Sequence, residues 1–405
     1  MPSREQQAVD AWLRSGCVAL TGRADGAPQV PPGDAALRAA EAAATFGVDG
    51  AQLLGERAAC LGLQRCGPWS AGGTCRGVRA RDGWFVLSLA RDDDVAAVPA
   101  LVEGDTLEST DAAWSAVQRY ARRRSVADVV ARAQLLGLPS GELAEPRRAR
   151  PGVQVTATGA SGPRPAVPLV VDLSALWAGP LCAHLLGLRG ARVVKVESTH
   201  RPDGARRGDA GFYDLLHGGH EAVALDLRGR AGVAALLALL GAADVVIESS
   251  RPRALAQLGI DVDAVLAASP TTWVCITAYG SEEPDRIGFG DDVALVAGLH
   301  VEDRGAPLPC GDAIADPLSG IAAAAAGQAE AARPRSALVD VSMADVVRAS
   351  LAARPGPPAA KARSGAWTVE GRPVPGPVAR EPHGRAPALG ADTRRVLAEL
   401  AVGAG

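Results

Sequence analysis

Asp316 is the side chain whose surroundings point most clearly to chemistry. It lies within GDAIADPLSG, from Gly311 to Gly320, and directly precedes Pro317 and an alanine-rich stretch. An aspartate before a proline is typical of a helix start, where the carboxylate caps free backbone amides. The same position orients a carboxylate and lowers its pKa. Two roles therefore stay open, a plain helix cap and a carboxylate that reacts with a substrate.

A second candidate site is a loop that follows a short apolar run. The run Leu169 to Val171 predicts a strand, and Ala178, Gly179 and Pro180 predict a turn into a helix. Gly190 ends that helix, and the β-branched residues after it predict a second strand. This is one βαβ unit of a parallel sheet, on which ligands bind beyond the carboxyl ends of the strands.

The cysteines and histidines indicate neither a disulfide framework nor a metal site. The seven cysteines form no CxxC pair, and an odd number in a long chain argues against disulfides. Most should be small buried hydrophobic residues, including Cys310 near Asp316. His217 and His220 have no third ligand candidate nearby, which favours a loop over a metal site.

Composition narrows the class of protein. At 405 residues the chain can bury a large core and form two domains. Its formal net charge of −3 argues against nucleic acid as a partner. No apolar run reaches the length of a membrane span, and the first residues lack the apolar core of a signal peptide. We therefore expect a cytoplasmic protein that binds neither nucleic acid nor membrane.

The second part of the chain alternates strands and helices. The expected elements are strand 223–227, helix 231–240, strand 244–248, helix 254–258 and strand 272–278. Residues 199–219 are expected to form a loop. The predicted fold class is α/β, an open parallel sheet with Rossmann-like βαβ units plus a smaller mixed α+β domain.

The first part is mostly helical in pattern. Asp82 and Gly83 interrupt the alternating segment 77–90 and predict a β-hairpin. Helices are expected at 10–20, 35–46, 51–63, 111–120 and 125–136. We expect four units: a first region at 1–145, a proline- and glycine-rich linker at 146–166, an α/β domain at 167–350, and a tail at 351–405 that completes it.

Motifs in the second part resemble family III of the CoA-transferases. The stretch VVDLSALWAGPLCAHLLGLRGARVVKVES, from Val170 to Ser198, is similar to the family's opening pattern. Similar segments follow in family order: VALDL (223–227), ADVVIE (243–248), PRALAQLG (252–259), GDAIADPLSG (311–320), VDVS (339–342) and PALGADTRRVLAEL (387–400). The resemblance implies a CoA-binding α/β domain that transfers CoA from an acyl-CoA thioester to a carboxylic acid.

The resemblance also assigns roles to individual residues. Asp316 matches the family's nucleophile, which comes to carry CoA as an aspartyl thioester. The residues that it implies for CoA binding are Leu176, Trp177, Ala178, Gly179, Arg228, Ser249 and Asp291. It implies no metal and no permanent cofactor, with acyl-CoA and a small carboxylic acid as substrates, and a homodimer.

Other interpretations of these residues stay open. Trp177 could be a core anchor, Arg228 a solvated side chain and Asp291 a helix cap. Ser249 replaces the family's Asn, and the glycine-rich loop that covers the aspartate in formyl-CoA transferase has no match. The alternative is a diverged, non-catalytic acyl-CoA-binding or regulatory homologue. An α-methylacyl-CoA racemase is disfavoured, because Gly290 stands where that branch has a proton-carrying histidine.

One family segment occurs twice in this chain. Residues 15–40 are similar to residues 297–320, and Arg38 stands in the first copy where the second has Asp316. The region 1–145 thus resembles a small domain and the back part of a degenerate transferase. We expect the two regions to complement each other within one chain. The alternative is an unrelated helical N-terminal domain.

Overall fold

A seven-stranded sheet forms the centre of the computed structural model, which describes residues 2–250, 252–351, 358–363 and 366–403. The strand order is β4-β12-β9-β8-β5-β6-β7. All neighbours pair in parallel except β4, which is antiparallel to β12. The strands are β4 (Val153–Ser161), β5 (Leu169–Asp172), β6 (Arg192–Ser198), β7 (Glu221–Leu225), β8 (Val245–Glu248), β9 (Thr272–Thr277) and β12 (Arg335–Ser342). The predicted α/β class is confirmed.

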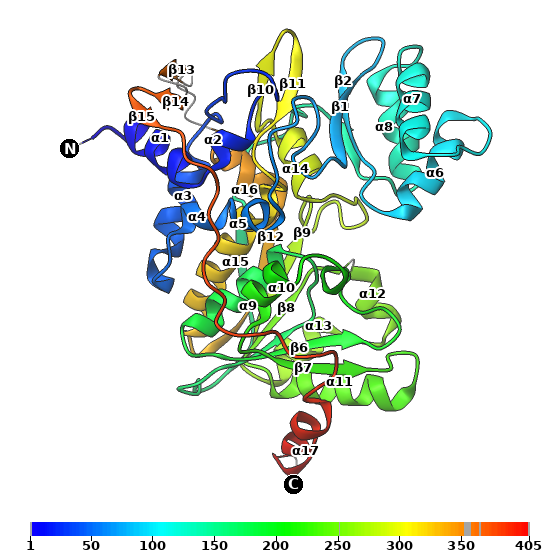
Figure 1. Cartoon of the computed structure of the whole chain (residues 1–405). Helices are drawn as coiled ribbons and strands as arrows, with labels where there is room; N and C mark the ends of the chain where they lie inside the picture. The colour runs from blue at the N-terminus through cyan, green and yellow to red at the C-terminus, as the bar shows by residue number, and fades with distance from the viewer. Residues whose placement is uncertain (1, 251, 352–357, 364–365, 404–405) are drawn as a thin grey trace.

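Both faces of the sheet are buried, which explains why most residues of its inner strands are apolar. Val170 lies on the face covered by α9 (Ala178–Leu188) and α15 (Ala315–Ala331). Its neighbour Val171 lies on the opposite face, covered by α11 (Arg230–Ala242) and α13 (Val262–Ala268) (Figure 1). The same alternation places Val245 and Val246 on opposite faces. α12 (Pro252–Gln257) follows β8.

A smaller mixed unit with its own hydrophobic core precedes the sheet in the chain. Its three antiparallel strands are β1 (Cys75–Arg79), β2 (Trp84–Ser88) and β3 (Ser140–Glu142). Its helices are α6 (Asp92–Val102), α7 (Thr110–Ala121) and α8 (Val126–Leu135). The predicted hairpin is confirmed, and Ala80 N–H donates to Gly83 O across its turn at 2.9 Å. The helices expected at 111–120 and 125–136 are confirmed within a residue at each end.

The first sixty residues form short helices that share the main hydrophobic core with the sheet domain. They are α1 (Arg4–Arg14), α2 (Cys17–Leu20), α3 (Ala35–Ala43), a 3₁₀ turn (Ala44–Phe46), α4 (Gly50–Leu53) and α5 (Glu56–Leu61). α3 packs against α15. The remaining elements beside them are α14 (Gly290–Ala297), the hairpin β10 (His300–Asp303) and β11 (Ala306–Pro309), and α16 (Met343–Ala349).

Two predictions about irregular segments are wrong. The linker expected at 146–166 contains β4, an edge strand whose small and polar residues lack the apolar run of the inner strands. The loop expected at 199–219 contains a 3₁₀ turn (Gly204–Arg207) and α10 (Ala210–His217). Asp209 caps α10 by accepting a hydrogen bond from Phe212 N–H at 2.8 Å, a signal present in the sequence.

The C-terminal tail connects the N-terminal helices to the far edge of the sheet (Figure 1). Its strands β13 (Ala360–Arg363), β14 (Ala366–Val369) and β15 (Arg372–Pro373) form a small antiparallel sheet, and Arg372 pairs with Asp10 on α1. Its last helix, α17 (Thr393–Gly403), packs beside β7 and α11. The predicted tail at 351–405 includes 352–357, 364–365 and 404–405, which lie outside the described residues. No helix of the described part is long and apolar enough to cross a membrane.

Candidate active site

Asp316 lies in the first turn of α15, where this helix meets the start of α14. Its Oδ2 atom accepts a hydrogen bond from the Gly290 N–H group at 3.1 Å. Gly290 is the first residue of α14, so the carboxylate accepts from a free amide of a neighbouring helix. Within the described residues, Asp316 caps no amide of α15 itself. Asp316 as a whole residue is partly exposed.

Two further carboxylates lie beside Asp316. Asp291 is buried on α14, and its Oδ1 atom accepts a hydrogen bond from Ala313 N–H at 2.7 Å. Asp312 is fully buried and accepts two hydrogen bonds from Arg57 on α5, at 2.6 Å from Nη2 and 2.9 Å from Nε. Such a fork is the strong, geometrically specific form of a carboxylate–arginine pair. The loop before α15 therefore gathers three acids and one arginine.

The ionisation of these acids reflects burial and mutual repulsion. The pKa of Asp316 is raised to about 7, mainly by burial; the positive charge of Arg57 opposes the rise, and the charge of Asp291 contributes to it. Burial also raises the pKa of Asp291 to about 6, with the charge of Asp312 acting in the same direction. Because close carboxylates titrate as a group, the pair releases its last proton near neutral pH. Asp316 therefore supplies a desolvated carboxylate at neutral pH.

The predicted CoA loop packs against α15 one turn beyond Asp316. A Cβ atom on Gly320 would lie 2.5 Å from the Ala178 carbonyl oxygen, so the close contact requires glycine there. Trp177 is 3% exposed and meets Phe212 edge-on at 5.2 Å, which fits a core anchor. Arg57 lies over the Trp177 ring at 5.8 Å. The structure thus brings Trp177 and Ala178 together with Asp316.

Leu176 and Gly179 flank these two residues in the loop. Leu176 is exposed and has a φ of 69°, a left-handed conformation that is rare for a bulky residue. Its N–H group donates to Asp203 Oδ1 at 3.1 Å. A Cβ atom on Gly179 would lie 2.1 Å from Ser174 Oγ, so glycine lets α9 close onto the loop.

A buried lysine on β6 supports this loop and was missed by the sequence analysis. Lys195 lies 3.5 Å from Asp172 and 3.1 Å from Asp203, with all three side chains almost fully buried. It also donates to the Ser174 carbonyl oxygen. Asp203 in turn accepts a hydrogen bond from the Leu176 N–H group, so Lys195 stabilises the loop through Asp203. The signal in the sequence was a lysine inside the apolar strand VVKVE.

Arg228 and Ser249 lie apart from this group. Arg228 is exposed after β7, and its N–H donates to Asp226 Oδ1 at 3.0 Å. Ser249 is exposed directly after β8. Both follow carboxyl ends of parallel strands, at the edge where ligands of such sheets bind. Their contact with CoA stays a prediction.

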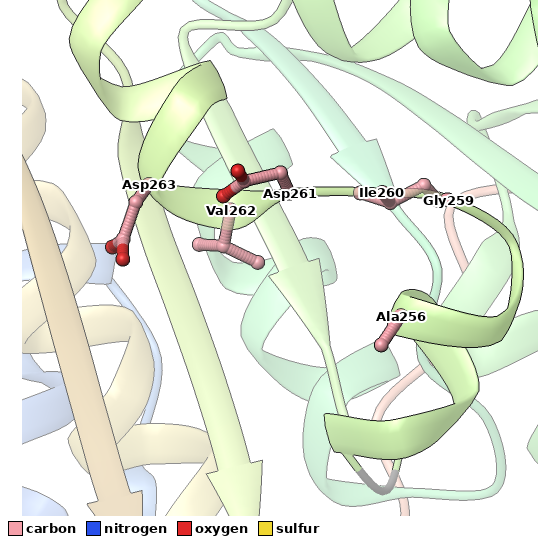
Figure 2. A pocket seen from close by; sticks show the side chains of 6 residues that line it. All are labelled: Ala256, Gly259, Ile260, Asp261, Val262 and Asp263. Atoms are coloured by element: carbon pink, nitrogen blue, oxygen red, sulfur yellow. The ribbon is translucent and has the colours of Figure 1, made fainter.

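A shallow hollow of about 440 Å³ lies where α12 is followed by α13 (Figure 2). Its lining is Ala256, Gly259, Ile260, Asp261, Val262 and Asp263. Asp261 caps α13 by accepting a hydrogen bond from Ala264 N–H at 3.1 Å. One of the two carboxylates that line the hollow therefore has a structural role. None of the predicted site residues lines it. Nowhere in the described ranges are three or more His, Cys, Asp or Glu side chains grouped to hold a metal ion.

The two copies of the repeated segment share a backbone feature and differ in charge. Gly33 and Gly311 occupy matching positions, with φ values of 77° and 69°. In the first copy, Arg38 Nε lies 2.6 Å from the buried Asp34, and Arg4 also pairs with this aspartate. A guanidinium therefore replaces the carboxylate of the second copy and is neutralised locally.

Gly290 leaves no room for a larger residue. A Cβ atom built there would lie 2.2 Å from Asp316 Oδ2 and 2.2 Å from the Ala313 carbonyl oxygen. Both distances are far below van der Waals contact. A histidine at this position, as in the racemase branch, would displace Asp316.

The α/β fold class agrees with the comparisons to known proteins. A profile of CoA-transferase family III matches residues 168–368, so this segment of the chain resembles that family. The chain is 30% identical over 179 residues to the succinate–glutarate CoA-transferase of Agrobacterium fabrum, covering 40% of this chain and 45% of that protein. The family resemblance seen in the motifs is confirmed.

Other relatives give the same match. The succinyl-CoA–D-citramalate CoA-transferase of Chloroflexus aurantiacus is 30% identical over 182 residues, covering 40% of this chain and 45% of that protein. A solved structure of a CaiB/BaiF family protein from Brucella suis is 26% identical, with a TM-score of 0.43 over 48% of this chain and 56% of that one. The chain spans less than half the length of these two curated relatives.

Proposed function

We propose that this protein transfers CoA from an acyl-CoA thioester to a carboxylic acid, with Asp316 as the nucleophile. The observation that carries the proposal is the Asp316 carboxylate, which accepts a hydrogen bond from the Gly290 amide and belongs to a partly exposed residue in the segment that matches the family. With a pKa of about 7 it is substantially ionised at neutral pH yet poorly solvated. Such a carboxylate is a better nucleophile than one in water.

The reaction proceeds through two exchanges at Asp316. A carboxylate oxygen attacks the thioester carbon of the acyl-CoA, the C–S bond breaks, and CoA leaves as a thiolate. The thiolate then attacks the aspartyl carbonyl of the mixed anhydride, which releases the donor acid and leaves CoA on Asp316 as a thioester. The acceptor acid repeats both steps in reverse order. No proton, oxidant or metal is consumed in this sequence.

In this proposal the residues around Asp316 orient the carboxylate and bind CoA, and they form no covalent bond with the substrates. The Gly290 N–H group orients the attacking carboxylate and stabilises charge on its oxygen. CoA would lie along the loop from Leu176 to Gly179, which Lys195 stabilises through Ser174 and Asp203. Arg228, Ser249 and Asp291 would make further contacts with CoA. The finer proposals from the family resemblance are a homodimer, a cytoplasmic location and no permanent cofactor.

Trapping the covalent intermediate tests this function. The protein is incubated separately with succinyl-CoA and with glutaryl-CoA, quenched with hydroxylamine, and digested for mass spectrometry. Hydroxylamine converts an aspartyl thioester to a hydroxamate, so the proposal expects this modification on Asp316 and its loss in Asp316→Asn. CoA binding without any adduct, across a wider panel of acyl-CoAs, would instead establish the non-catalytic alternative.

A further inference from the structure

Arg57 reaches the candidate active site from outside the part of the chain that matches the family. It lies on α5 in the N-terminal region, whereas the match covers residues 168–368. Its partner Asp312 lies 255 positions later, directly before the loop that carries Asp316. The guanidinium also lies over the Trp177 ring, which belongs to the predicted CoA loop. One N-terminal side chain therefore contacts both parts of the site.

The guanidinium keeps one nitrogen available. Nε and Nη2 donate to the two oxygens of Asp312, and their fork fixes the plane of the group. Nη1 donates to no atom of the described residues, and the side chain is 27% exposed against 0% for Asp312. A guanidinium nitrogen that is fixed in position on a partly exposed side chain and has no partner is suited to donate to a carboxylate oxygen.

The charges at the site determine at which stage of the reaction the binding of a further carboxylate is favourable. In the resting site, Arg57 faces the acids Asp291, Asp312 and Asp316, so a further anion is disfavoured. When Asp316 carries CoA as a thioester, it has lost its charge. An incoming carboxylate then restores the number of negative charges that Arg57 faced before the reaction.

We propose that Arg57 receives the carboxylate of the acid substrate beside Asp316. This inference rests on the proposed function, because it assigns the acid subsite of the same reaction. The donor acid leaves from this position, and the acceptor acid enters it. The N-terminal region would thus supply the acid-binding cation to a family III catalytic segment.

The test compares acid binding with thioester chemistry in the full-length protein. Removing Arg57 alone would leave the buried Asp312 unpaired, so the main variant is the double change Arg57→Gln/Asp312→Asn, which removes both charges. Arg38→Gln is the matched control, because it breaks an arginine–aspartate pair in the first copy, away from Asp316. Binding of succinate and of glutarate is measured by titration calorimetry without acyl-CoA, before and after the Asp316→Asn change, which removes the charge of residue 316 as the thioester does and prevents turnover. Adduct formation on Asp316 is measured as described above.

We expect the double variant to bind succinate and glutarate about 10- to 100-fold more weakly, the loss of one charge-assisted hydrogen bond. Arg38→Gln should bind both acids and form the Asp316 adduct from succinyl-CoA like the unmutated protein. Unchanged acid binding in the double variant would overturn the inference, as would the absence of acid binding to the unmutated protein. Arg57-dependent acid binding without any adduct would support the acid site and overturn the transfer reaction.

Discussion

Replacing Asp316 by asparagine should stabilise the protein more at high pH than at low pH. Burial raises the pKa of Asp316 to about 7 in the folded protein, from an ordinary value of 3.8. Between these values the folded state retains a proton that the unfolded chain has released, so its stability falls as pH rises. From about pH 5 to about pH 7 this loss amounts to ~2.7 kcal/mol. Asparagine cannot ionise, so the stability of the variant does not decrease with pH through this residue.

Calorimetric melting of both proteins at about pH 5 and about pH 8 measures this difference. An unfolding entropy of ~2 cal/mol/K per residue converts ~2.7 kcal/mol into ~3 °C for a chain of this length. The advantage of Asp316→Asn in Tm should therefore be about 3 °C larger at the higher pH. Asp93→Asn, which changes an exposed carboxylate on α6, is the control and should act equally at both pH values. An equal effect of Asp316→Asn at both would refute the argument.

Two further variants test the geometry around Asp316. Gly290→Ala places a Cβ atom 2.2 Å from Asp316 Oδ2, so transfer activity should fall by about 100-fold or more while acyl-CoA binding persists; wild-type turnover in this variant would contradict the described packing. Asp291→Asn removes a charge that raises the pKa of Asp316, so the acid limb of the rate-against-pH profile should move to lower pH. A limb that stays in place or moves upward would show that Asp291 does not act on the nucleophile.

The parts of the fold that could be predicted are those with a local pattern. The inner strands are apolar on both faces, and the turn at Asp82 and Gly83 lies between alternating residues. β4 was not predicted, because its strand conformation depends on pairing with β12, almost two hundred positions later. As an edge strand it also needs little apolar surface. α10 carried a cap signal at Asp209, but the glycines around it obscured the helix.

The site was only partly accessible to sequence reasoning. Asp316 and the loop at 176–179 stand out through local motifs, and the structure brings Trp177 and Ala178 to the helix that carries Asp316. Arg57 could not be identified from a local motif, because its place at the site depends on the contact with Asp312, a residue 255 positions later in the chain. Whether Asp316 caps its own helix was equally undecidable, since the answer depends on how closely α14 approaches α15.

The route of the C-terminal tail has a consequence for synthesis on the ribosome. Glu56 is buried and pairs with Arg380, and the loop at Gly16 packs directly on Pro377. A nascent chain therefore lacks these contacts until Pro377 and Arg380 have been synthesised. Folding of this region depends on contacts between residues as far as 324 positions apart, which should make it slow. Arg57, on the helix that begins at Glu56, would be among the last groups of the site to be set in place.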